Sequence, residues 1–325
     1  MQKLSTDYLG LKLSSPLIVG SSNLTSSVDK LKKAEDFGAG AVVLKSLFEE
    51  QITHYAGKLS DYSTYPEAED SIAYYTRSKS VEEYLTLVSS AKQSLGIPVI
   101  PSINCVTSEE WTNFAKEIVN AGADALEINV FFLPNDKNMS SAEAEKLYFD
   151  LIIKLKKTVK IPLVIKIGPR FSNILYIIDQ FYKRGVNGVV LFNRFYEPDI
   201  DVKNLSIVPA PVFSVEAERR YVLRWVAMAS ALDIKIDISA STGVRRGEDV
   251  IRYLLAGADT VQVCSVLYEK GISYLKEITN EMSDWMTENN FKSINEFRGK
   301  LNYQNIEHQS IFERSQFIKY FSSKV

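Results

Sequence analysis

Eight short runs of apolar and β-branched residues recur along this chain, separated by longer segments whose apolar residues have helical spacing. The runs are residues 16–22, 41–47, 98–104, 125–130, 162–167, 188–193, 234–241 and 260–266. Nearly continuous apolar runs bounded by glycine or proline are typical of strands buried on both faces, as in parallel sheets covered by helices. The chain therefore predicts parallel strands that alternate with helices.

The segments between these runs carry signals for helix ends. Residues 28–40, 108–124 and 247–259 each contain Gly-Ala close to their C-terminal end, and Ser108 is a candidate N-cap before two glutamates. A glycine after a helix accepts the left-handed backbone of a C-cap and lets the chain turn into the next strand. Eight strands alternating with helices favour an α/β fold of the closed (β/α)8 TIM-barrel type, with a doubly wound open sheet as the alternative.

Composition and charge narrow the class of protein. With 325 residues and 46% hydrophobic content, one domain can span residues 1–325. The net charge of −2 is spread along the chain, so nucleic acid is not an expected partner, and the apolar runs are far shorter than the roughly 20 residues of a membrane helix. Cys105 and Cys264 fit no metal or iron–sulfur spacing, and with no signal-peptide pattern at the N-terminus we expect a cytoplasmic protein without a metal.

Polar residues stand where the apolar runs end. In a (β/α)8 barrel the chemistry collects at these C-terminal strand ends. The set is Ser21, Ser22, Asn23, Lys45, Ser46, Asn104, Asn129, Lys166, Asn193, Ser241, Thr242, Gly243, Cys264 and Ser265. Such amide, hydroxyl and ammonium groups suit a large ligand with many acceptors across the barrel mouth. Singly, each has an ordinary alternative, such as a turn or cap for an asparagine and a surface position for Lys45.

The last two strands suggest a phosphate site. Residues 239–244 (SASTGV) are small, so their backbone N–H groups can approach an anion closely, and the helix that begins near Gly247 adds a positive dipole end. Barrels often bind phosphate after strands 7 and 8, which makes Cys264 and Ser265 the second loop. A tight structural turn is the alternative interpretation of residues 239–244.

Several motifs together resemble one family. They are residues 8–25 (YLGLKLSSPLIVGSSNLT), 43–46 (VLKS), 127–135 (EINV with LPN), 162–169 (PLVIKIGP), 191–193 (LFN), 241–268 and 291–301. From end to end the chain resembles the soluble class 1 dihydroorotate dehydrogenases, which are FMN enzymes on a (β/α)8 barrel. The resemblance implies oxidation of dihydroorotate to orotate in pyrimidine biosynthesis by hydride transfer to flavin N5, and a homodimer.

The resemblance also implies site residues. FMN would be bound by Ser21, Ser22, Lys45, Ser46, Asn104, Asn129, Lys166, Ser241, Thr242, Gly243, Cys264 and Ser265, the last five at its phosphate. The implied catalytic residues are Lys45, Asn129 and Asn193. Lys166 would lie by the pyrimidine end of the flavin ring, where a fixed ammonium stabilises the negative charge of the reduced cofactor.

Two segments depart from the family pattern. The family carries a Cys or Ser base directly before a proline, whereas Leu133 precedes Pro134 here and cannot accept a proton; Cys105 and Asp136 are weak substitutes, and His54 is more typical of a surface. After the second strand, residues 67–85 lack the family's Asn-rich substrate segment. Residues 74–77 (YYTR) could form a different pocket, with a solvated loop as the alternative.

The sequence thus predicts an FMN-dependent oxidoreductase that acts on a CH–CH bond of a small-molecule substrate. The alternatives are a flavin-dependent reductase of another unsaturated substrate, a catalytically silent flavin-binding barrel, and a non-redox barrel that binds a sugar phosphate. The chain carries no dinucleotide fingerprint and no iron–sulfur cysteine cluster, so a separate partner, fumarate or another acceptor could take the electrons.

Overall fold

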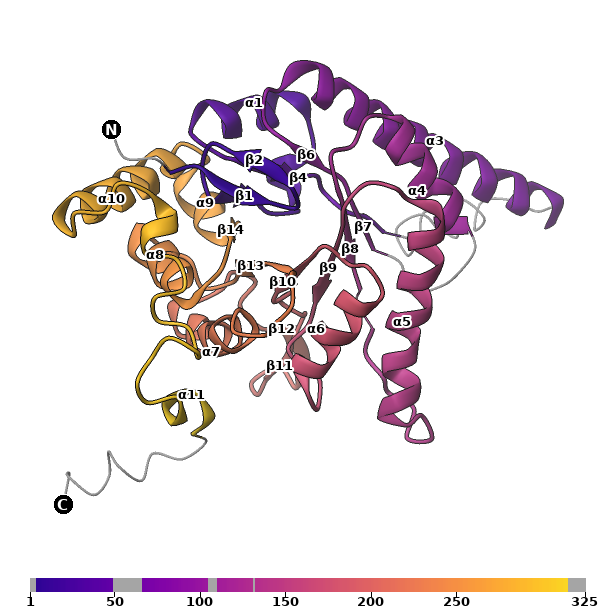
Figure 1. Ribbon diagram of the computed structural model, residues 1–325. Coiled ribbons are helices and arrows are strands. Elements are labelled where there is room, and N and C mark those ends of the chain that lie inside the picture. Colours follow the sequence, from indigo (N-terminus) through magenta and orange to yellow (C-terminus); the bar gives the residue numbers. More distant parts are fainter. Residues whose placement is uncertain (1–3, 49–65, 105–109, 131, 315–325) are drawn as a thin grey trace.

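The computed structural model describes residues 4–48, 66–104, 110–130 and 132–314 (Figure 1). Its central sheet consists of β3 (Leu17–Val19), β4 (Ala41–Val43), β5 (Leu47–Phe48), β6 (Val99–Ile100), β7 (Ser102–Asn104), β8 (Leu126–Asn129), β9 (Leu163–Ile167), β10 (Gly188–Leu191), β13 (Asp237–Ser241) and β14 (Thr260–Val263). Each of the eight apolar runs contains strand residues, and every pairing in this sheet is parallel.

The sheet closes on itself. Its order is β5-β7-β8-β9-β10-β13-β14-β3-β4-β6, in which β4 pairs with β6 at one end and β5 pairs with β7 at the other. Because β6 and β7 are consecutive pieces of one run, interrupted at Pro101, and β4 and β5 are pieces of another, the two ends meet. Proline donates no ladder hydrogen bond, which accounts for the interruption. The TIM-barrel prediction is confirmed, and the open-sheet alternative is wrong.

Helices surround the strands (Figure 1). They are α1 (Val28–Asp36), α3 (Pro66–Ser94), α4 (Glu110–Asn120), α5 (Ser141–Thr158), α6 (Ile174–Lys183), α7 (Arg219–Ala229), α8 (Gly247–Ala256), α9 (Ser265–Lys270), α10 (Tyr274–Glu288) and α11 (Ser310–Glu313). Short 3-10 turns η1 (Asn23–Thr25), η2 (Glu216–Glu218) and η3 (Ile294–Glu296) complete the set. As predicted, a left-handed glycine, Gly257, caps the C-terminus of α8. The proposed N-cap Ser108 lies outside the described residues.

The main core lies between the strands and the helices. On α6, Ile174, Ile177, Ile178 and Phe181 are all buried. Their spacing of three and four residues places them on one helix face, which packs against the outer side of the barrel. Burial of each such side chain stabilises the fold by about 1.5–3 kcal/mol relative to an exposed position. These contacts therefore hold the helices against the strands.

An N-terminal hairpin closes the base of the barrel. Strands β1 (Thr6–Tyr8) and β2 (Leu11–Leu13) pair antiparallel, and Tyr8 is buried with Leu9 and Leu13 in a cluster that includes Ile18 and Val164. Leu9 N donates to Asp237 Oδ2 at 2.5 Å, at the first residue of β13. The hairpin, which the sequence analysis did not predict, therefore fills the end of the barrel opposite the predicted site.

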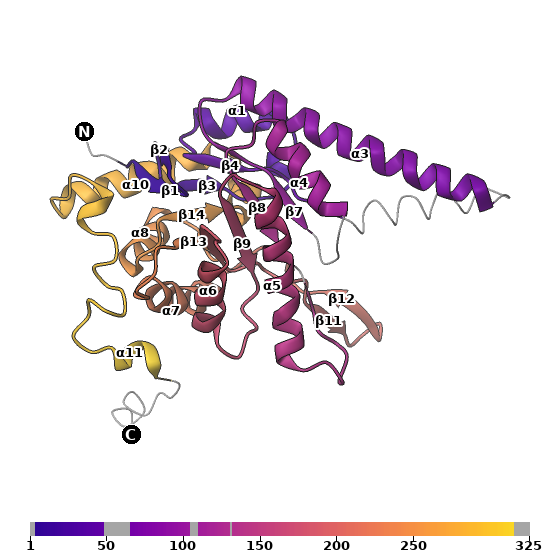
Figure 2. The same cartoon turned by 45° about the vertical axis from the view of Figure 1, so that its right-hand side comes forward.

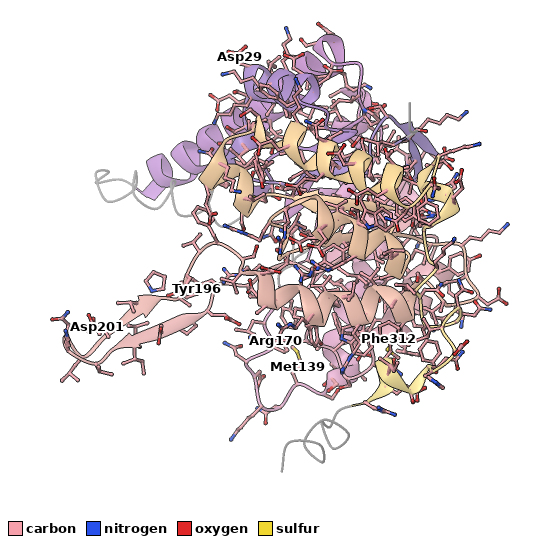
Figure 3. The ribbon with its side chains drawn as sticks, turned by 90° about the vertical axis from the view of Figure 1, so that its left-hand side faces the viewer. Asp29, Met139, Arg170, Tyr196, Asp201 and Phe312 are labelled. Atoms are coloured by element: carbon pink, nitrogen blue, oxygen red, sulfur yellow. The ribbon has the colours of Figure 1, made fainter. Side chains whose placement is uncertain are left out.

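Two further elements extend from the barrel. Helix α3 runs well beyond its neighbours (Figure 2), and its backbone includes residues 74–77, so the solvated-loop interpretation of that segment is wrong. The side chains of residues 74–77 lie outside the described part of the structure. Strands β11 (Pro198–Asp201) and β12 (Ser206–Pro209) form an antiparallel hairpin that projects as an arm, with Tyr196 near its base and Asp201 towards its tip (Figure 3).

Candidate functional site

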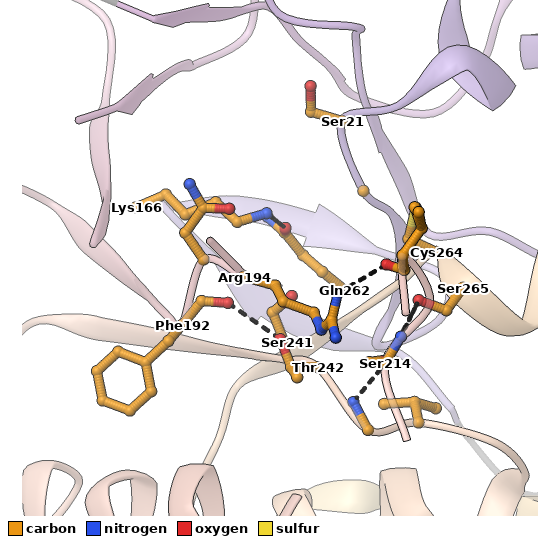
Figure 4. Close-up of a pocket in the computed structure, with 15 residues that line it drawn as sticks. Ser21, Lys166, Phe192, Arg194, Ser214, Ser241, Thr242, Gln262, Cys264 and Ser265 are labelled. Carbon is orange, nitrogen blue, oxygen red and sulfur yellow. Dashed lines mark hydrogen bonds between the residues drawn. The ribbon is translucent and has the colours of Figure 1, made fainter. Parts of the chain in front are cut away.

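A cavity of ≈ 170 Å³ lies at the C-terminal strand ends (Figure 4). Eight predicted residues line it: Ser21, Lys166, Asn193, Ser241, Thr242, Gly243, Cys264 and Ser265. Seven further lining residues were not predicted: Gly20, Phe192, Arg194, Val212, Ser214, Val244 and Gln262. The barrel brings residues from β9, β10, β13 and β14 together because parallel strands end on the same side.

The loops after β13 and β14 meet through Ser214. Ser214 N and Oγ both donate to Ser265 Oγ at 3.1 Å, and Gly243 N donates to Ser214 Oγ at 3.2 Å. Thr242 and Gly243 adopt positive φ angles of 85° and 74° in succession. A Cβ on Gly243 would lie 2.7 Å from Arg219 N, so both the backbone conformation and the packing require glycine here.

The N-terminus of α8 is satisfied within the protein. Arg245 N and Arg246 N donate to Asp249 Oδ2 at 2.8 and 3.2 Å, and Gly247 N donates to Glu281 Oε2 at 2.6 Å. The buried Asp249 carboxylate also pairs with Arg219. These three N–H groups therefore already have partners within the protein, and the anion at this helix N-terminus is the protein's own carboxylate.

Lys166 reaches the cavity from β9. Its side chain is 8% exposed, and its Nζ donates to Gln262 Oε1 at 2.8 Å. Gln262 comes from β14 and in turn donates from Nε2 to Glu127 Oε2 at 2.6 Å. One cation therefore stands at the inner wall of the cavity, held by an amide from another strand.

The two predicted catalytic asparagines lie together. Asn193 Nδ2 donates to Asn129 Oδ1 at 2.7 Å, with Asn193 lining the cavity and Asn129 buried behind it. Next to Asn193, Arg194 donates from Nε to Glu218 Oε1 at 2.9 Å and from Nη1 to Val212 O at 2.8 Å. The hydrogen bond between Asn129 and Asn193 leaves further donors and acceptors on both side-chain amides, which a polar ligand could use.

A chain of hydroxyl groups supports the opposite wall. Ser21 Oγ lies 2.9 Å from Ser46 Oγ, which lies 2.7 Å from Ser102 Oγ. Tyr84 OH donates to Ser102 O at 2.9 Å. Ser46 therefore lies behind Ser21, which lines the cavity, and the hydrogen bond between the two hydroxyl groups fixes the orientation of the Ser21 side chain.

The other predicted binding residues stand outside this cavity lining. Ser22 caps η1, where its Oγ accepts from Leu24 N at 3.2 Å. Lys45 and Asn104 follow or end neighbouring strands, but neither is among the residues that line the cavity.

Neither Leu133 nor the nearby Asp136 offers a base at the cavity, because neither residue lines it. Leu133 is 61% exposed, and the exposed Asp136 accepts from Asn138 N at 2.9 Å in a turn of its own. Among the residues that line the cavity, the titratable side chains are Lys166, Arg194 and Cys264. Cys105 and His54 lie outside the described residues.

Cys264 is a poor proton acceptor. Burial raises the pKa of its thiol, and the Ser22 hydroxyl and the Lys166 charge oppose that shift only in part. The thiol therefore stays protonated at neutral pH. Within the described ranges, no cluster of His, Cys, Asp and Glu could hold a metal ion, and no helix there is long and apolar enough to cross a membrane.

Comparison with known proteins decides the family. A family model described as dihydroorotate dehydrogenase matches residues 3–286. This chain belongs to the dihydroorotate dehydrogenase family. The predicted family is confirmed, as is the prediction of an oxidoreductase, since members of the dihydroorotate dehydrogenase family are flavoproteins acting on CH–CH bonds.

Curated relatives match over most of their length. The chain is 27% identical to a Thermoplasma acidophilum protein named dihydroorotate dehydrogenase B (NAD(+)), catalytic subunit, over 92% of this chain and 99% of the relative. A Methanocaldococcus jannaschii protein of the same name is 25% identical, with 88% and 94% covered. A chloroplastic Arabidopsis thaliana protein named dihydropyrimidine dehydrogenase (NADP(+)) is also 25% identical, with 91% and 76% covered.

Proposed function

We propose that this chain oxidises dihydroorotate to orotate with FMN as its cofactor. The observation that carries the proposal is the cavity at the barrel mouth, which joins Lys166, Asn193 and the two loops at Thr242 and Ser265. It supports the proposal because it combines a cation, amides and hydroxyls in one place, within a chain whose family match covers residues 3–286.

The lining residues fit FMN chemically. The lining set contains two cations, Lys166 and Arg194, and hydroxyl groups such as Thr242 and Ser265, and it contains no carboxylate that would repel a phosphate. The backbone of Thr242 and Val244 and the Ser265 hydroxyl would hold the phosphate, with Gly243 N already donating to Ser214 Oγ, and Lys166 would lie beside the ring. When bound, FMN supplies a two-electron acceptor next to the substrate.

The remaining polar residues would orient the substrate. The Asn129–Asn193 pair is held by its mutual hydrogen bond, so its free donors and acceptors are fixed in direction before a ligand binds. Dihydroorotate carries amide groups that match such a pair, and Lys45 would complete the catalytic set. Because Leu133 offers no base, the substrate proton would pass to water or to a group other than residue 133.

A second candidate is reduction of another unsaturated pyrimidine. One observation favours it: the relative whose name is dihydropyrimidine dehydrogenase. A reductase must deliver a proton to the substrate, which Leu133 cannot do, so that proton would come from a tyrosine or from water. Both candidates require the same cofactor.

The assembly of the protein is a proposal of its own. We propose that the chain works with a second subunit, because two of these relatives are named catalytic subunits of an NAD(+) enzyme, and that it forms a homodimer, as its resemblance to the class 1 enzymes implies. The arm offers a contact surface, since Ile200, Val202, Leu205 and Ile207 are all exposed on it. Apolar side chains gathered on a projecting hairpin are typical of a surface that another protein covers.

The test begins with the purified protein. We expect its visible spectrum to contain flavin bands and the released cofactor to have the mass of FMN. Anaerobic addition of dihydroorotate should then bleach the bands, whereas the second candidate predicts reoxidation of reduced protein by an unsaturated pyrimidine.

Two lysine variants complete this test. Lys166→Ala should lower the flavin content or make reduction harder, while Lys160→Ala, at an exposed lysine between α5 and β9, serves as the matched control. A protein without flavin bands would contradict both candidates.

A further inference from the structure

A carboxylate is buried inside the barrel below the cavity. Glu127 on β8 is 1% exposed, and its Oε2 accepts from Gln262 Nε2 at 2.6 Å. Its Oε1 is buried and has no hydrogen-bond partner among the described residues. A buried carboxylate is costly unless a positive group compensates it, and the function proposed above does not use this one.

Gln262 connects this carboxylate to Lys166. Its Oε1 accepts from Lys166 Nζ at 2.8 Å, while its Nε2 donates to Glu127. The reverse orientation of the amide would set donor against donor and acceptor against acceptor. The amide is therefore aligned between the side-chain amine of Lys166 and the carboxyl group of Glu127.

The strands fix the depth of each group. Glu127 pairs with Val164 and Asn129 pairs with Lys166 across β8 and β9. Glu127 therefore lies two residues along the strands from the level of Lys166, towards the base of the barrel and on the same face of the sheet. Gln262 reaches them from β14, which is separated from β9 by β10 and β13 in the sheet. The link therefore crosses the barrel interior, and only the Lys166 and Gln262 members of it line the cavity.

Charge compensation follows from this arrangement. An ammonium beside a bound ring raises the local potential, and a carboxylate one amide away reduces that effect. The carboxylate also acts on the base of the barrel, where burial and then the charge of Glu127 raise the pKa of Tyr8 well above its ordinary value. Glu127 therefore acts on Lys166, through Gln262, towards the cavity and on Tyr8 towards the base of the barrel.

We propose that Glu127 and Gln262 are positioning residues that hold Lys166 at the cavity and set how much positive charge Lys166 presents to the cofactor. This inference rests on the proposed function in that the group beside Lys166 is taken as FMN. In this arrangement Glu127 keeps the reduction potential of the bound flavin below the value that an uncompensated Lys166 would produce.

The test compares midpoint potentials of bound flavin. Glu127→Gln keeps the side-chain shape and an acceptor for Gln262 but removes the charge. We expect the reduction equilibrium constant to rise about tenfold, which is about 30 mV for a two-electron couple. Thr260→Val is the matched control, because Thr260 is a buried polar residue on β14, as Gln262 is, but it carries no charge and does not line the cavity.

A double-variant cycle tests the route through Lys166. Lys166→Met alone should lower the potential, and Glu127→Gln in that background should change the equilibrium constant by less than about threefold. A Glu127→Gln potential equal to that of Thr260→Val would overturn the proposal. An equal shift in both backgrounds would also overturn it, because Glu127 would then act on the flavin without Lys166.

A second measurement needs no flavin. In cofactor-free protein, competitive acetylation read by mass spectrometry reports the neutral fraction of each lysine. Glu127→Gln should raise the labelling rate of Lys166 several-fold relative to that of the exposed Lys160, because the Lys166 side chain loses its counter-charge. An unchanged ratio refutes the inference even if the protein binds no flavin, whereas missing flavin with a raised ratio refutes only the proposed function.

Discussion

Replacing Gly243 by alanine tests the loop that we assign to the phosphate. Its φ of +74° disfavours a side chain by roughly 1–2 kcal/mol. The new Cβ would also lie 2.7 Å from the backbone Arg219 N, and overpacking of this kind costs about 1–3 kcal/mol. Reduced freedom of the unfolded chain returns about 0.4–1 kcal/mol. We therefore expect a loss of about 1–5 kcal/mol in the free energy of unfolding.

Gly10 supplies the matched control. Its φ is +75°, nearly the same as that of Gly243, but nothing lies within 4 Å of a Cβ built on it. Gly10→Ala therefore carries the backbone penalty without the clash, and the two variants should differ by about 1–3 kcal/mol. Urea unfolding followed by tryptophan fluorescence measures both free energies of unfolding.

Flavin content separates stability from binding. Gly243→Ala should lose bound flavin under conditions where it is still folded, because the substitution would shift the loop that we propose to hold the phosphate, and Gly10→Ala should keep it. Equal losses of stability in the two variants would refute the packing argument. A Gly243→Ala protein that is destabilised but keeps its full flavin affinity would refute the assignment of this loop to the phosphate.

Three shorter predictions concern other parts of the molecule. Asp249→Asn should lower the free energy of unfolding by about 1.5–3 kcal/mol in urea titration, because Arg219 loses the buried one of its two carboxylate partners and keeps Glu216; a loss below about 1 kcal/mol would contradict this. The raised pKa of Cys264 predicts slow alkylation by iodoacetamide at about pH 8, with a rate that still climbs at higher pH, measured on its peptide by mass spectrometry; a rate equal to that of the urea-unfolded chain would show that the pKa of the thiol is not raised. Ile200→Asp with Leu205→Asp on the arm should convert a dimer to a monomer in analytical ultracentrifugation, and an unchanged mass would place the dimer contact elsewhere.

The sequence predicted the barrel because its signal is local and repeated. Each strand is an apolar run with its own boundaries, and α8 ends at a glycine as expected. The two hairpins carry no comparable signal. Residues 6–13 form very short strands, and they are buried because they pack into the base of the barrel, which a local sequence pattern does not show. In residues 198–209, Ile200 and Ile207 are exposed to solvent, so their apolar pattern does not indicate a buried strand.

The site was predictable as far as strand ends determine it. Ser241, Lys166 and Asn193 converge because a barrel directs all its strand ends to one side. Ser214 comes from a loop whose path depends on tertiary contacts, and no sequence pattern reveals it. Gln262 had a signal that was overlooked: it is a lone amide within the apolar run TVQV, where a buried polar side chain needs a partner.

The α8 N-terminus shows the same limit. An acidic residue at position 249 in the first turn is a capping signal, and it competes with any external anion for the same N–H groups. The sequence shows that an anion can be stabilised there. Only the structure shows that the anion is the protein's own carboxylate.

Among the described residues, the hairpin fills the base of the barrel, and the cavity lies at the opposite end, where the strands end. A small-molecule electron donor and a small-molecule acceptor that both bind in this cavity would enter by the same rim, above which the arm also rises after the end of β10. Two reactants that share one opening exclude each other, so the first product leaves before the second reactant enters. Steady-state plots at several concentrations of the second reactant should then give parallel lines, the kinetic pattern of a ping-pong exchange.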